Sequence, residues 1–110
     1  MPYTAPLSDY RLLFDVLGFD QVAATERFGH ATPDTVDAIL TEAARLSQTT
    51  LAPLNRAGDL HPAVLEGGTV RTSPGFAAGF RAVAEGGWIG ISAQPEFGGM
   101  GLPLALSTCV

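Results

Sequence analysis

The chain contains no lysine, a single cysteine and no long run of apolar residues. Without lysine it has no side-chain amine for a Schiff base and no lysine for a P-loop. Cys109 has no second cysteine to pair with, which favours a reducing compartment, the cytoplasm, and a role as a buried apolar side chain. The sequence has no stretch of 18 apolar residues, and it does not begin with a positively charged region followed by a hydrophobic one. It therefore predicts neither a membrane span nor a signal peptide.

Positive charge is also scarce. The formal net charge is −5, and the few basic residues are scattered along the chain without forming a cluster. Binding of nucleic acid is disfavoured, because it needs a basic stripe that displaces counterions from phosphate. The basic residues are the arginines Arg11, Arg27, Arg45, Arg56, Arg71 and Arg81.

Apolar residues, by contrast, are plentiful for a chain of this size. Of 110 residues 46% are hydrophobic and 15% are charged, which indicates a globular class with one small core. The apolar share is higher than a small self-sufficient domain needs. We therefore expect part of this surface to meet a partner.

The pattern of caps and breaks predicts helices. Thr32-Pro33 is a strong helix start, and from Val36 onward apolar residues recur at three- and four-residue spacing. Further helices are predicted at residues 9–17 with Ser8 as N-cap, within 20–28, and from 103 to 110.

Two segments between the helices carry predicted breaks. Pro53 is expected to kink or end the central helix, with residues 55–59 leaving it as a turn. Gly67-Gly68 joins two short extended pieces, for which a minimal hairpin and a plain loop both fit. Ser73 is then predicted to cap a helix of about three turns that ends at Gly86.

Residues with catalytic chemistry are sparse. His30 and His61 have no metal-ligand spacing around them, and Ser92 lacks the flanking glycine of a nucleophile elbow. The carboxylates of the central helix are interpreted as its solvent-exposed face. For Glu96 a structural ion pair or cap is favoured over an acid/base role.

The glycines near Phe97 admit two interpretations. A phosphate loop is one, but Leu104 stands where the dinucleotide fingerprint requires its third glycine. A tight turn is the other and is favoured. Aromatic side chains here are core residues or the wall of an acyl pocket.

The same region carries a family resemblance. Pro95-Glu96-Phe97-Gly98-Gly99-Met100-Gly101, preceded by Gly87-Trp88-Ile89-Gly90-Ile91, resembles a signature of the acyl-CoA dehydrogenases. Residues 2–13 and 51–59 resemble the long branch of that family that includes methylmercaptopropionyl-CoA dehydrogenases, so the resemblance covers essentially the whole chain.

The resemblance implies an all-α fold, in which residues 1–110 form the N-terminal helical domain and residues 1–30 an extension. In the family a β-rich middle domain and a C-terminal helical domain follow, and FAD binds between them and a neighbouring subunit of a homo-oligomer. A glutamate from the C-terminal region abstracts the α-proton of the acyl-CoA while flavin N5 accepts a hydride from the β-carbon, giving a 2-enoyl-CoA. Weak candidates for the pocket wall are Trp88, Phe97, Met100 and Leu102.

Neither later domain is present in these 110 residues, so the resemblance assigns no catalytic, FAD-binding or metal-binding residue here. We expect a truncated, split or incomplete sequence, cut within its last helix and inactive alone. An alternative is a small helical interaction protein that docks on a separately encoded partner. Related acyl-CoA oxidases and flavin monooxygenases of the same fold are not separated from the dehydrogenases by these residues.

Overall fold

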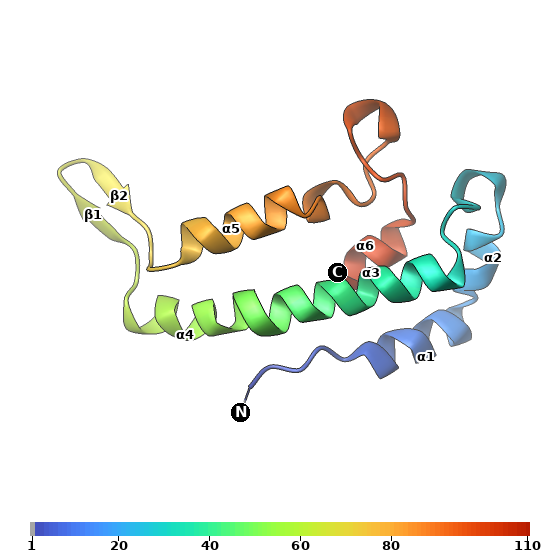
Figure 1. Cartoon of the computed structure of the whole chain (residues 1–110), viewed down its shortest axis with the longest axis horizontal. Coiled ribbons are helices and arrows are strands. Elements are labelled where there is room, and N and C mark those ends of the chain that lie inside the picture. Colours follow the sequence, from blue (N-terminus) through green and yellow to red (C-terminus); the bar gives the residue numbers. More distant parts are fainter. Residues whose placement is uncertain (1) are drawn as a thin grey trace.

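The computed structural model describes residues 2–110, so Met1 of the predicted extension lies outside the described residues. Its main body is a long central helical rod with shorter helices beside it (Figure 1). The molecule is a thin slab with extents of 53 × 37 × 18 Å. The helices are α1 (Leu7–Leu17), α2 (Phe19–Ala23), α3 (Pro33–Leu46), α4 (Ala52–Leu60), α5 (Phe76–Glu85) and α6 (Leu104–Cys109).

The start of the central rod confirms the predicted cap. Thr32 has extended backbone and its hydroxyl oxygen accepts a hydrogen bond from the amide of Thr35, while Pro33 occupies the first turn. Val36, Leu40, Ala43 and Ala44 form the buried face of α3. The expectation of an all-α architecture is therefore confirmed in this part of the chain.

The prediction that Pro53 kinks or ends the central helix is wrong. A π-helical turn, Ser47–Leu51, joins α3 to α4, and Figure 1 shows the two as one continuous rod. A regular α-helix would set the proline ring against the carbonyl four residues earlier. The wider turn just before Pro53 relieves that clash, and residues 55–59 stay helical instead of forming a turn.

Two predicted N-caps are also wrong. The helix α1 begins one residue before Ser8, where the carbonyl of Pro6 accepts the amide of Tyr10. The helix α5 begins at Phe76 and not at Ser73, because Gly75 precedes it with φ of 82°, a left-handed conformation that only glycine adopts readily.

The remaining elements follow the expected order. A hairpin, β1 (Val64–Glu66) paired antiparallel with β2 (Thr69–Arg71), forms around Gly67-Gly68, so the hairpin alternative is confirmed over the plain loop. It projects from one end of the slab (Figure 1). None of the helices in residues 2–110 has the length and apolar character needed to cross a bilayer.

The core lies where the first half of α3 meets α6 and the chain that leads into it. It joins residues far apart in the sequence, since Ile91 and Leu106 have no exposed surface and pack with Leu40. Half-buried side chains from α1, α2 and the C-terminus extend this cluster. The six buried members are Ala31, Val36, Leu40, Ile91, Leu102 and Leu106.

Candidate functional site

The glycine-rich segment between α5 and α6 folds into a closed loop. The carbonyl oxygen of Gly90 accepts a hydrogen bond from the amide of Met100 at 3.0 Å. The carbonyl oxygen of Ile91 accepts one from the amide of Leu102, also at 3.0 Å. Ala93 accepts the amide of Gly101 at 2.9 Å. These amides already donate within the loop, so they do not point outward as a phosphate cradle would require.

Close packing explains one glycine in particular. A Cβ on Gly99 would stand 2.1 Å from the carbonyl oxygen of Ala93. No side chain fits at that distance, so the two halves of the loop touch backbone to backbone. This geometry supports the tight-turn interpretation of the motif.

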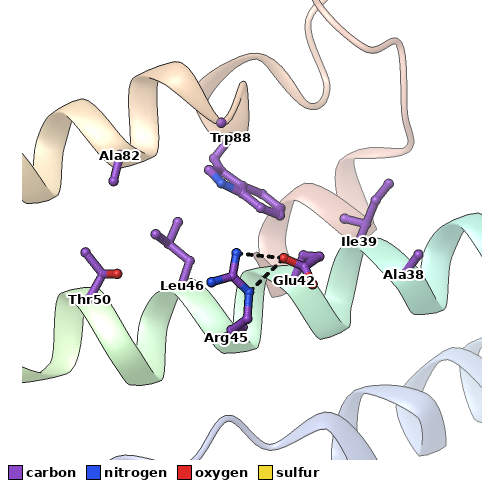
Figure 2. A pocket seen from close by; sticks show the side chains of 9 residues that line it. Ala38, Ile39, Glu42, Arg45, Leu46, Thr50, Ala82 and Trp88 are labelled. Carbon is purple, nitrogen blue, oxygen red and sulfur yellow. Dashed lines mark hydrogen bonds and ion pairs between the residues drawn. The ribbon is translucent and has the colours of Figure 1, made fainter.

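A cleft of about 590 Å³ lies beside this loop, between α3 and the end of α5. Figure 2 shows the Trp88 indole directed from the end of α5 toward α3, between Leu46 and Ile39. The volume falls within the range typical of small-ligand sites. Its walls come from both helices, so an occupant would contact α3 and α5 together.

The polar rim of the cleft is formed by one ion pair. Arg45 donates through Nε to Glu42 Oε2 at 2.9 Å, and its Nη2 lies at the same distance from that oxygen (Figure 2). Both side chains are more than half exposed. A carboxylate already held in an exposed ion pair suits the edge of a binding site better than proton abstraction.

The four predicted wall residues occupy different environments. Trp88 is half-buried and lines the cleft, whereas Leu102 is 4% exposed and belongs to the core. Phe97 is 80% exposed at the tip of the loop, and Met100 lies near Gly87 at its base. Of the four, the structure places only Trp88 in the cleft.

Sequence reasoning missed the α3 side of the cleft. The apolar face predicted from Val36 onward includes Ile39 and Leu46, but its spacing does not show that it lines a cleft. Nothing in the local sequence shows that Trp88 crosses to this face. The spacing of seven residues between Ile39 and Leu46 places them two turns apart on one face of the helix, and this was the signal that could have pointed to that face.

A second cavity, of about 350 Å³, brings together residues considered separately in the sequence. His30, Ser92 and Glu96 line it with Arg27. His30 Nε2 lies 3.2 Å from the carbonyl oxygen of Met100 and ties the loop to the region before α3. Within residues 2–110 no hydrogen bond joins Ser92 to His30, so the nucleophile and base contact of a hydrolytic triad is not formed.

Glu96 itself is exposed in the turn Pro95–Phe97. Among the described residues it forms no ion pair and no side-chain cap, so the predicted structural pairing of Glu96 is wrong. The four ion pairs of residues 2–110 involve other carboxylates.

Cys109 packs at the edge of the core, and burial raises the pKa of its thiol. The folded chain thus holds the thiol proton more tightly than the unfolded chain does. The stabilisation is complete below the ordinary thiol pKa and is lost as pH rises through the folded pKa. We expect the urea midpoint to fall at alkaline pH more steeply than for Cys109→Ser; equal pH dependence of the two proteins would contradict this.

Two characterised enzymes are similar to this chain. It is 34% identical over 104 residues to a 3-methylmercaptopropionyl-CoA dehydrogenase of Ruegeria pomeroyi, covering 94% of the chain and 18% of that protein. It is 31% identical over 96 residues to a broad-specificity linear acyl-CoA dehydrogenase of Mycobacterium tuberculosis, covering 86% of the chain and 16% of that protein. The chain thus spans less than a fifth of either relative. No protein-family model matches it.

Proposed function

We propose that this chain, whose sequence resembles an N-terminal segment of acyl-CoA dehydrogenases, acts as the N-terminal helical part of an FAD-dependent enzyme of that family. The similarity to two such enzymes confirms the resemblance seen in the sequence, and it carries the proposal. The reaction would be α,β-dehydrogenation of an acyl-CoA thioester to a 2-enoyl-CoA, in a homo-oligomer. FAD would supply hydride acceptance, and the chain's own residues would bind and shield the acyl chain.

We also propose which part of that enzyme each domain would form. Residues 1–110 would form the helical domain, with 1–30 as an extension, and a β domain and a second helical domain would hold FAD and the catalytic glutamate. The single cysteine supports a cytoplasmic location. The higher identity to the Ruegeria pomeroyi enzyme supports the methylmercaptopropionyl-CoA branch.

Within this chain we assign substrate contact to the cleft beside Trp88. The indole, Ile39 and Leu46 offer an apolar wall of the kind that an acyl chain buries against. Phe97, Met100 and Leu102 are retained as weaker members of the wall, and the terminal methyl of Met100 lies close to Gly87, the residue before Trp88.

A direct test uses the natural protein that contains this sequence. Tagged in its source cells, purified and supplied with an artificial electron acceptor, it should carry flavin and oxidise an acyl-CoA. A purified protein that lacks flavin and leaves acyl-CoA thioesters unchanged would overturn the proposal.

The Trp88 assignment makes a kinetic prediction for that flavin-containing protein. Trp88→Ala removes an apolar wall worth about 1.5 kcal/mol or more of burial, so kcat/KM for a long-chain acyl-CoA should fall about 10-fold. Ile89→Ala is the matched control, because Ile89 is the neighbouring residue and is 68% exposed. An equal effect of both substitutions would contradict the assignment.

The alternative function, a helical protein that docks on a separately encoded partner, is favoured by one observation. The outer side of α1 leaves Leu12, Leu13, Val16 and Leu17 between 49% and 76% exposed. Contiguous exposed apolar surface marks interaction sites. If the isolated chain is monomeric, cooperatively folded and does not bind a hydrophobic dye, this alternative loses its support.

A further inference from the structure

A groove lies between α1, α2 and the first half of α3. Figure 1 shows α1 and α2 on the side of the rod opposite to α5. Its volume of about 1230 Å³ exceeds the range of about 300–1,000 Å³ that is usual for small-ligand pockets. The groove shares only Ala38 and Glu42 with the lining of the cleft beside Trp88. Its size fits a segment of polypeptide better than a metabolite.

The floor of the groove is apolar. Phe14 and Phe19 stack with ring centroids 4.2 Å apart and an interplanar angle of 14°, and both line the groove. Val36 and Leu40, which are buried core residues, complete the floor from α3. An apolar side chain of a partner would therefore meet aromatic and aliphatic surface.

The rim of the groove is acidic. Asp15, Asp20 and Asp34 come from three different helices, and within residues 2–110 none of them forms an ion pair. Arg11 is the one basic side chain among the described lining residues, and it already donates to Asp37. The groove thus presents three aspartates without ion-pair partners around an apolar floor.

We propose that this groove binds a basic amphipathic helix of a protein partner, with aliphatic or aromatic side chains on the Phe14–Phe19 floor and arginines or lysines against the three aspartates. Helix-in-groove recognition uses an apolar face of this kind, and the charge of the rim selects the sign of the partner. The inference stands independently of the acyl-CoA dehydrogenase proposal.

The test measures binding of synthetic peptides to the 110-residue chain. The probe is an amphipathic helical peptide with leucines on one face and arginines on the other. One comparison peptide replaces every arginine with glutamine, and another keeps the arginines and replaces every leucine with serine. The probe alone should bind well, and its binding should weaken as salt is raised.

A variant locates the site. Asp15→Asn, Asp20→Asn and Asp34→Asn combined should weaken probe binding about 10-fold, since each exposed charge pair contributes modestly and the contributions multiply. The matched control, Glu26→Gln, Glu85→Gln and Glu96→Gln, removes the same charge outside the groove and should change binding by less than about 2-fold. Circular dichroism verifies that both variants keep the helical fold.

Several outcomes overturn the proposal. Absence of probe binding does so, as does equal binding of the glutamine or serine peptide, because either shows that one half of the recognition is unnecessary. Equal weakening by the groove variant and the control variant shows general charge attraction instead of a site. The peptide comparison needs no variant, so it decides the matter even if a variant fails to fold.

Discussion

Replacing Gly99 with alanine is expected to destabilise the chain by about 3 kcal/mol, the upper end of the usual cost of overpacking. The added Cβ would lie 2.1 Å from the carbonyl oxygen of Ala93 and 2.3 Å from its carbon. Both are backbone atoms, which do not rotate away as a side chain does. The loop must open, and the hydrogen bond from Gly101 to Ala93 is lost with it.

Gly90→Ala is the matched control for that experiment. It lies in the same loop, and its added Cβ would meet its nearest neighbour at 3.6 Å, an ordinary contact. Its effect should stay within about 0.5 kcal/mol. Urea denaturation followed by circular dichroism measures both. Equal free energies of unfolding for the two variants would show that the backbone contact does not hold the loop.

Replacing Leu106 with alanine is the second large effect that we expect. This side chain is fully buried in the core, where α6 meets α3, so its removal leaves a cavity that costs about 3 kcal/mol. Leu104→Ala, two residues earlier in the same helix, changes a side chain that is 70% exposed and should cost less than about 1 kcal/mol.

Thermal unfolding distinguishes the two leucines. The melting temperature of Leu106→Ala should fall by several degrees more than that of Leu104→Ala. Similar losses in both variants would mean that α6 does not dock on α3 as the structure describes. That result would also remove the packing that positions the loop before it.

Helix starts were predictable from sequence only where a side chain caps the first turn of the helix. Thr32 and Pro33 carry a complete local signal, and the structure follows it. Ser73 carries a similar signal, yet the backbone of Gly75 delays that helix by adopting a positive φ. Competition between neighbouring signals is settled by tertiary packing, which local spacing does not contain.

The course of the chain at Pro53 shows another limit. Proline does forbid the regular hydrogen bond and the regular position of its ring, as the sequence indicates. A π-helical turn accommodates both restrictions without a bend in the rod. The restrictions that Pro53 imposes were therefore predictable from the sequence. How the helix accommodates them depended on the turn before the proline.

The candidate site was predictable only in part, for a similar reason. The spacing of the glycines excluded a dinucleotide fingerprint and indicated a turn, and the closed loop agrees with that interpretation. The partnership of Trp88 with Ile39 and Leu46 depends on how α5 crosses α3. Contacts between residues so far apart in the chain have no local signal in a single sequence.

We propose that these residues shape a substrate-binding wall and that parts of the enzyme outside them supply the redox chemistry. The most direct measurement purifies the 110-residue chain in the presence of excess FAD and determines bound flavin and acyl-CoA oxidation with an artificial electron acceptor. We expect no stoichiometric flavin and no turnover. Stoichiometric flavin together with acyl-CoA oxidation by this chain alone would contradict it.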